Sequence, residues 1–119
     1  MMLKEPVSDS VVRRLPRYYR YLSELERAGV ERTSSQALAT QLGSTASQIR
    51  QDLNCFGGFG HQGYGYHVSD LRTQLGRIIG LEQCMPAVLI GAGHLGSVIA
   101  VNIDFPAYGF YLTGIFDIV

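Results

Sequence analysis

The stretch that decides the fold of the C-terminal third of the sequence is AVLIGAGHLG, residues 87–96. Its first four residues are all apolar, which is typical of a strand buried in a parallel sheet. The glycines that follow have the spacing G-x-G-x-x-G, which permits a tight turn, close approach of the backbone to a pyrophosphate, and close packing of helix on strand. We expect a helix over about 95–103 whose N-terminus faces the phosphates.

The sequence after that helix predicts a turn at 106–109 and a second strand over 110–116, which ends at Asp117. A carboxylate at this distance from the glycines accepts hydrogen bonds from both ribose hydroxyls and repels a 2′-phosphate, so a preference for NAD over NADP is predicted. A structural glycine turn without a ligand is the alternative, and the order strand, glycines, helix, strand and acid favours the cofactor site. The predicted cofactor-binding residues are Gly91, Ala92, Gly93, His94, Leu95, Gly96 and Asp117.

Upstream of this unit the sequence predicts three helices. Residues 8–28 carry apolar side chains at helical spacing and end before a glycine, with Pro16 either kinking the helix or starting its second half. Ser34 and Ser35 offer caps for a short second helix that Gly43 closes. The third helix starts at Thr45, where T-A-S-Q predicts a capping box in which the Gln48 side chain returns to the cap.

The third helix has an apolar face and a polar face that holds one basic residue. Two short helices joined through a glycine-containing turn predict a helix-turn-helix, whose second helix lies in the major groove. There Arg50 would pair with guanine, and Gln48 or Gln51 with adenine. An ordinary helical hairpin is the alternative, and this segment alone does not separate the two.

Residues 56–68, FGGFGHQGYGYHV, alternate glycines with bulky side chains. This pattern predicts a hairpin with its tip at 61–63, and a hairpin that follows a recognition helix is a wing that reaches phosphates or the minor groove. A flexible glycine loop is the alternative, although it would leave the bulky side chains wet. Ser69 is predicted to cap one more helix that ends at Gly80.

The charges are unevenly distributed although the 119 residues have a net charge of zero. Residues 11–20 hold four Arg and no acid, whereas residues 83–119 contain neither Lys nor Arg. The basic run indicates either a nucleic-acid contact or a solvated helix face. No apolar segment is long enough to cross a membrane and no export signal is visible, so we expect a cytoplasmic protein.

The sequence predicts no metal site and no catalytic residue. Cys55 and Cys84 match no metal-binding spacing, and we expect both to be small buried hydrophobic residues. Direct thiol sensing by Cys55 is the minor alternative. The predicted fold class is therefore an α+β winged helix-turn-helix domain over 1–80, a linker over 81–86, and the first β-α-β of a Rossmann dinucleotide-binding domain over 87–119, which is incomplete.

The whole pattern resembles the Rex family of bacterial redox-sensing transcriptional repressors over nearly the full length of the chain. The resemblance rests on RLPRYYRYL at 14–22, Ser34 and Ser35, SQIRQD at 47–52, FGGFG at 56–60 with GYGY at 63–66, and GAGHLG at 91–96 with Phe116 and Asp117.

This resemblance implies a homodimeric repressor that senses the NADH/NAD ratio and that leaves palindromic operator DNA when NADH closes the dimer. Such linkage typically amounts to about 1–3 kcal/mol. NAD(H) would be a ligand and not a substrate, so the protein would not be an enzyme. The residues expected to bind DNA are Arg14, Arg17, Tyr18, Ser35, Thr45, Ser47, Gln48, Arg50, Gln51, His61 and Gln62.

Two features depart from the family pattern. His61 and Gln62 stand where a basic pair is usual, so we expect weaker phosphate contact and a smaller salt dependence. The sequence also ends soon after the second predicted strand, which leaves an apolar sheet edge unpaired. We therefore expect a fragment of a longer protein, or a form that pairs this edge with another copy, and we do not expect tight NADH binding.

Two other functions remain open at this point. One is an NAD-dependent dehydrogenase that has lost its catalytic half, which residues 91–117 suggest when taken alone. The other is a scaffold that dimerises through its strand edge without recognising a DNA sequence. The Arg-rich first helix and the wing argue against the dehydrogenase.

Overall fold

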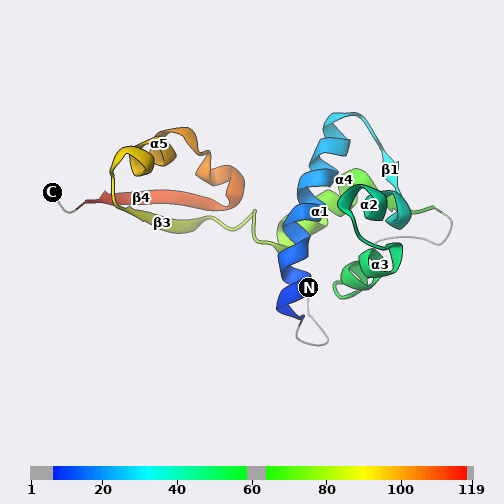
Figure 1. The fold of residues 1–119 in the computed structure, drawn as a ribbon. Helices are drawn as coiled ribbons and strands as arrows, with labels where there is room; N and C mark the ends of the chain where they lie inside the picture. The colour runs from blue at the N-terminus through cyan, green and yellow to red at the C-terminus, as the bar shows by residue number, and fades with distance from the viewer. Residues whose placement is uncertain (1–6, 59–63, 118–119) are drawn as a thin grey trace. The chain divides into compact units, whose positions relative to one another are not determined.

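A computed structural model describes residues 7–58 and 64–117 of the chain. The chain divides into two compact units, Met1–Ile79 and Gly80–Val119. Figure 1 shows that helices dominate the first unit, whereas the second consists of a strand pair with a helix packed on it.

The N-terminal unit contains the helices that the sequence predicts. Its elements are α1 (Asp9–Arg27), β1 (Arg32–Thr33), α2 (Ser35–Leu42), α3 (Ala46–Asn54), β2 (Tyr66–His67) and α4 (Val68–Ile78). Helix α1 continues through Pro16, which lies inside it. The predicted helices are therefore confirmed, with bounds that differ by one or two residues.

Local side chains fix where these helices start and end. The Ser34 hydroxyl accepts a hydrogen bond from the Ala37 amide at 3.0 Å, and the Thr45 hydroxyl accepts one from the Gln48 amide at 3.1 Å. Gly43 ends α2 at a φ of 67°, in the left-handed region that glycine tolerates. The prediction of Ser69 as a cap is wrong: α4 begins at Val68, and its cap is His67, the last residue of β2 and two residues before Ser69.

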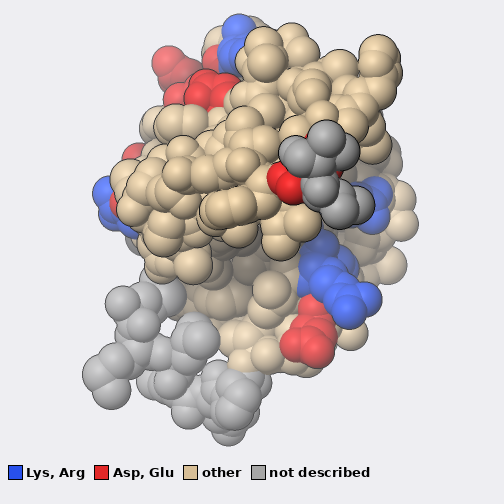
Figure 2. Space-filling view, turned by 90° about the vertical axis from the view of Figure 1, so that its left-hand side faces the viewer, with Lys and Arg blue, Asp and Glu red and all other residues tan. Residues whose placement is uncertain are grey.

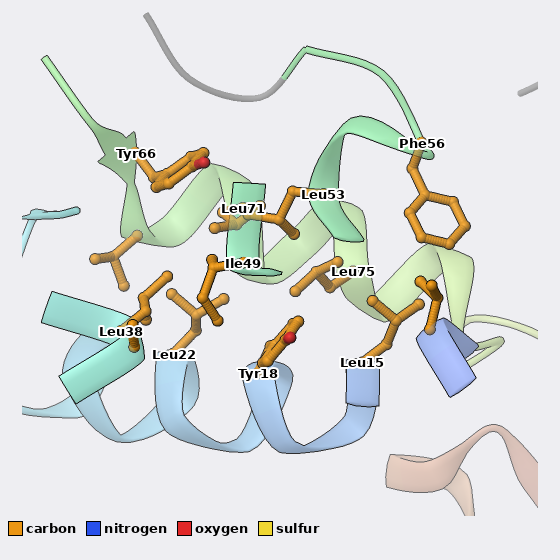
Figure 3. Packing of buried hydrophobic residues seen from close by; sticks show 13 residues of the cluster. Leu15, Tyr18, Leu22, Leu38, Ile49, Leu53, Phe56, Tyr66, Leu71 and Leu75 are labelled. Carbon is orange, nitrogen blue, oxygen red and sulfur yellow. The ribbon is translucent and has the colours of Figure 1, made fainter. Parts of the chain in front are cut away.

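The core of this unit lies between α1, α3 and α4, as Figure 3 shows. Leu15, Leu22 and Leu75 are fully buried, and each contributes about 1.5–3 kcal/mol through removal of its side chain from water. The α2–α3 pair adds Leu38, Ile49 and Leu53 to the same cluster. Helix α3 is thus anchored by its apolar face, which leaves its polar face outward.

The strand of the predicted wing pairs with a distant segment. β2 is antiparallel to β1, with Arg32 opposite His67 and Thr33 opposite Tyr66. Gly65 is packed so closely against the Thr33 carbonyl that a Cβ would collide with it. The sequence predicted a local hairpin instead, but the described residues before its tip, 56–58, form no strand, and the tip residues His61 and Gln62 lie outside the described residues.

The C-terminal unit is the predicted β-α-β. It consists of β3 (Met85–Ile90), α5 (His94–Asn102), the 3₁₀ turn η1 (Phe105–Tyr108) and β4 (Phe110–Phe116). The two strands are parallel, and Ile90 lies opposite Phe116 at their ends. β3 begins two residues before the predicted strand, so Pro86, expected in the linker, lies within it; an edge strand tolerates a residue without an amide hydrogen.

The secondary structure of this unit leaves much apolar surface exposed. No residue of β3, α5 or β4 is buried, and Ile90 and Val101 are 80% and 83% exposed. On the face drawn in Figure 2, uncharged side chains cover most of the surface, in agreement with the absence of Lys and Arg from residues 83–119. None of the helices that the structure describes is long and apolar enough to cross a membrane.

Candidate nucleic-acid interface and phosphate loop

Helix α3 presents a polar face that is open to solvent. Ser47, Arg50 and Gln51 are exposed, whereas Ile49 and Leu53 on the opposite side are buried in the core. Gln48 is half-buried at the edge between these two faces. The side chains predicted to read bases therefore lie on one element, with hydrogen-bonding groups suited to the edges of base pairs.

The structure brings two predicted site residues together across the helix-turn-helix. Arg50 Nη1 on α3 donates a hydrogen bond to Ser35 Oγ on α2, 3.1 Å away. Arg50 also influences Tyr66 of β2: burial raises the pKa of that phenol, and the guanidinium charge opposes the rise. The Arg50 guanidinium is thus held by a contact from α2 while it remains exposed.

Asp52 connects α3 to α1. Its carboxylate is 1% exposed and receives two hydrogen bonds from Arg14, with Nε 2.7 Å from Oδ2 and Nη2 2.9 Å from Oδ1. The Tyr18 hydroxyl donates to Oδ2, and Gln48 Nε2 donates to Oδ1 at 2.8 Å. Burial alone would raise the pKa of Asp52, but these hydrogen bonds outweigh it and hold the pKa below its ordinary value.

Sequence reasoning did not select Asp52 as a site residue. The signal that could have found it is a carboxylate four positions after Gln48, on the same face of the helix, opposite an arginine-rich first helix. The network also corrects the predicted capping box. The Thr45 half is present, but the Gln48 side chain donates through Nε2 to the Asp52 carboxylate, a charge-assisted hydrogen bond, instead of accepting one from the Thr45 backbone amide.

The burial of Tyr18 corrects a second prediction. Its side chain is 3% exposed, and its hydroxyl is engaged by Asp52, so it is not available to a DNA phosphate. Arg14 is 32% exposed, and its guanidinium forms the ion pair with Asp52. Both residues therefore hold α1 against α3.

The side chains of two other residues predicted to bind DNA, Arg17 and Thr45, lie where α2 ends and α3 begins. The exposed Arg17 donates from Nη2 to the Leu42 carbonyl at 3.2 Å, which places a positive charge at the C-terminus of α2. Thr45 is exposed as the cap of α3. Its hydroxyl accepts from the Gln48 amide, so its own hydrogen remains available to donate.

The glycine loop at 91–96 has a geometry that suits a phosphate. Gly91 has a φ of 93°, and its amide donates to the Phe116 carbonyl at 2.7 Å, which fixes the loop to the end of β4. A Cβ on Gly96 would collide with the Gly91 carbonyl, so only glycine lets α5 approach the loop. By contrast, a Cβ on Gly93 would meet no atom within 4 Å, so this position faces open space.

The start of α5 completes this loop. Gly93 is its N-cap, and no side chain in the described part of the chain caps it there. The Ser97 hydroxyl donates to the Ala92 carbonyl at 2.9 Å, which ties the first turn to the loop. His94 and Leu95 are exposed, and Asp117 follows the strand residue that holds Gly91. The residues present therefore fit a pyrophosphate on the helix N-terminus with a carboxylate beside it.

Both cysteines differ from their prediction. Cys55 and Cys84 are exposed free thiols and not buried residues. Cys55 follows the last turn of α3, where its Sγ contacts the Gln51 carbonyl at 3.4 Å, and Cys84 precedes β3. Within residues 7–58 and 64–117, no group of three His, Cys, Asp or Glu side chains could hold a metal ion.

Comparison with known proteins gives similar results for sequence and structure. Residues 6–54 match the family model described as "Putative DNA-binding protein N-terminus". The chain is 55% identical to the redox-sensing transcriptional repressor Rex of Thermoanaerobacter pseudethanolicus over 118 residues, which is 99% of this chain and 53% of that protein. It is 53% identical to Rex of Clostridium acetobutylicum over 115 residues, 97% of this chain and 54% of that protein. The chain thus spans about half the length of the curated relatives it matches.

Solved structures give the same correspondence. A crystal structure of RSP in complex with beta-NAD+ and operator DNA matches with a TM-score of 0.89 and 56% identity over 97% of this chain and 53% of that one. RSP in complex with beta-NADH matches with a TM-score of 0.87 and 51% identity over 98% of this chain and 53% of the other. Another RSP structure, at a TM-score of 0.85, is described as a Rex-family repressor.

Proposed function

Because the chain belongs to the Rex family of redox-sensing transcriptional repressors and spans about half the length of the relatives it matches, we propose that it binds operator DNA and that NADH weakens this binding. The observation that carries the proposal is that one chain joins an exposed polar recognition helix, α3, to the glycine loop at 91–96. A dehydrogenase would need only the second of these features.

In this proposal α3 enters the major groove and reads bases with Ser47, Gln48, Arg50 and Gln51. Arg50 is the candidate for guanine, because its guanidinium is exposed and is held by Ser35. The exposed side chains of Arg17 and Thr45 are the candidates for phosphates, and His61 and Gln62 are proposed for the wing. Tyr18 and Arg14 support this surface from α1 through Asp52, and we do not propose that they contact DNA.

NAD(H) is the ligand proposed for the glycine loop. The backbone from Gly91 to Gly96 would hold the pyrophosphate, with the open side of Gly93 facing it, and Asp117 would accept the ribose hydroxyls. NADH and NAD+ differ in their nicotinamide ring, so the nicotinamide of a bound cofactor would distinguish the reduced from the oxidised form. Because the relatives are named as repressors, we propose that the cofactor is read as a signal and is not turned over.

Regulation then requires NADH to bind the DNA-free state better than the DNA-bound state. A coupling of about 1–3 kcal/mol, which is five- to 150-fold in affinity, is typical. We further propose a homodimer on a palindromic operator, since two-fold proteins bind two-fold sites, and the cytoplasm as the place of action. The proposed DNA-binding domain is 1–80 and the NAD(H)-binding unit runs to 119; since β3 begins at Met85, the proposed linker shortens to 81–84.

Fluorescence anisotropy with labelled duplexes tests the function. The probes are the palindromic duplex recovered by selection from a random double-stranded library and a scrambled duplex of the same composition. We expect preferential binding of the palindrome, and dissociation on addition of NADH but not of NAD+. Equal affinity for both duplexes at low salt would refute sequence recognition, and an unchanged affinity with saturating NADH would refute redox sensing by this chain.

A further inference from the structure

We propose that Asp52 is a positioning residue: its buried carboxylate orients the side-chain amide of Gln48. In this orientation Gln48 prefers adenine over the other bases at one base pair of the operator. The inference rests on the proposed DNA-binding function and adds a specificity determinant to it. Asp52 is 1% exposed, whereas Gln48 lies half-buried at the edge of the exposed polar face of α3.

The hydrogen bond between the two residues defines which way the amide faces. Gln48 Nε2 lies 2.8 Å from Asp52 Oδ1, four residues further along the same helix. An ionised carboxylate only accepts hydrogen bonds, so the amide nitrogen must face it and the amide oxygen must face away. A flipped amide would place two acceptors against each other in a largely buried site, which is unfavourable.

The carboxylate is itself held so that it cannot turn. Arg14 donates to both of its oxygens, and the Tyr18 hydroxyl donates to Oδ2. Both donors come from α1, which packs against the core through Leu15 and Leu22. The orientation of Gln48 therefore depends on the hydrogen bonds that α1 donates to Asp52 and not only on contacts within α3.

The fixed amide matches one base better than the others. With one Nε2 hydrogen on Asp52, Gln48 retains a second hydrogen on Nε2 and the acceptor Oε1. A donor and an acceptor side by side complement N7 and the N6 amine of adenine. Guanine presents two acceptors at the same edge, so it would leave Oε1 without a donor. A side-chain amide that rotates freely loses conformational entropy when it binds a base, and it can also turn to match another base, so it distinguishes adenine from guanine less well.

Replacement of Asp52 by Asn tests this arrangement. The single remaining oxygen should stay at the Oδ2 position, where both Arg14 Nε and the Tyr18 hydroxyl donate. The new amide nitrogen would then face Gln48 Nε2, and two donors would oppose each other, so the Gln48 amide should turn or detach. Tyr18→Phe is the matched control, because it removes a hydrogen bond from the same carboxylate without touching the one to Gln48.

The experiment selects a duplex from a random library with the wild-type 119-residue chain and measures affinity for every single-base-pair change in the half-site. Gln48→Ala identifies the position that Gln48 reads by a loss of about 5- to 150-fold in preference, the usual worth of a bidentate base contact. We expect Asp52→Asn to lose most of the preference at that same position, and Tyr18→Phe to keep it within about twofold of the wild type. Preferences at other positions should stay unchanged in all folded variants.

The outcomes separate this inference from the proposed function. If the wild-type chain enriches no sequence, the proposed function fails. If it does, but Asp52→Asn retains the preference that Gln48→Ala loses, or the preferred base there is not adenine, the inference is overturned. If Asp52 had a merely structural role, Asp52→Asn would reduce the base preference at all positions of the half-site alike. Tyr18→Phe would then reduce these preferences as well.

Should Asp52→Asn not fold, the wild-type chain still decides the question by NMR. We expect the two side-chain amide protons of Gln48 to differ in exchange rate, with one protected by Asp52, while those of the exposed Gln41 exchange alike. Equal and rapid exchange of both Gln48 protons would overturn the inference.

Discussion

Arg50 on α3 donates a hydrogen bond to Ser35 on the preceding helix, α2, with Nη1 3.1 Å from Oγ. The bond spans the turn between α2 and α3, so the guanidinium is oriented in the free protein, ahead of the DNA binding proposed for it. Preorganisation of this kind reduces the entropy lost when a long side chain is immobilised in an interface.

Arg50→Lys should lower affinity for the selected operator by about 5- to 150-fold, because an ammonium lacks the fork that guanine requires. Ser35→Ala should cost less, about tenfold or below, since it removes one neutral hydrogen-bond partner. Anisotropy titrations of the selected and scrambled duplexes measure both effects. Gln36→Ala, next to Ser35 on α2, is the control and should bind as the wild type does; equal losses on both duplexes would show that Arg50 contacts only phosphates.

Gly93→Ala should abolish or strongly weaken NADH binding without disturbing the fold. A Cβ at this position meets no protein atom within 4 Å, so the methyl group would occupy the space proposed for the pyrophosphate. Gly96→Ala should instead lower the unfolding temperature of the C-terminal unit, because its Cβ collides with the Gly91 carbonyl. NADH fluorescence titrations and thermal unfolding separate the two results, and wild-type NADH affinity in Gly93→Ala would contradict the proposed site.

The free energy of unfolding should fall as the pH drops below about 4. The pKa of Asp52 is lowered in the folded state, since its hydrogen bonds outweigh the effect of burial. Its contribution to stability is therefore complete above the pKa of an unfolded aspartate, near pH 4, and is lost as the pH falls toward the folded value. Urea titrations between pH 2 and 7 measure this loss, and a similar slope in Asp52→Asn would assign it to other carboxylates.

Arg14→Met should destabilise the N-terminal unit by about 3 kcal/mol, because it leaves a buried carboxylate without its cation. We take the lower end of the usual range because the Arg14 side chain is 32% exposed. Arg17→Met is the matched control: the exposed Arg17 donates only to a carbonyl, so less than about 1 kcal/mol is expected. Chemical denaturation followed by circular dichroism compares them, and equal losses would contradict the role of Asp52 as the partner of Arg14.

Both thiols should react in the folded protein. Cys55 and Cys84 are exposed, so titration with a thiol-specific disulfide reagent under native conditions should find two groups that react nearly as fast as in denaturant. One unreactive thiol would show that the residue is covered in solution. Cys55→Ser and Cys84→Ser assign the two reaction phases.

Features that depend on neighbours in sequence were predictable. Ser34 and Thr45 cap their helices and Gly43 closes α2, because each signal is contained in a few consecutive residues. The glycine loop was predictable for the same reason, since a strand, three glycines and a helix follow each other directly.

Features that depend on distant residues were missed. The strand of the wing pairs with Arg32 and Thr33, more than 30 positions away, and no local pattern indicates that partner. Tyr18 looked like a phosphate contact beside the arginines, but the chain folds its hydroxyl onto Asp52, 34 positions later. The Gln48 side chain was assigned to the capping box, but it donates to Asp52 on the same helix, whose carboxylate is held by Arg14 and Tyr18 from the distant α1.

The carboxylate of Asp52 has a consequence for anyone who would retarget this protein to another DNA sequence. A library that varies Gln48 without its neighbours would remove one of the hydrogen bonds to the buried Asp52 carboxylate in most of its members, which lowers their stability. Varying positions 14, 18, 48 and 52 together would let new base preferences arise with a compatible interior. In α3, a change of base preference at position 48 therefore requires matching changes in the buried residues that contact it.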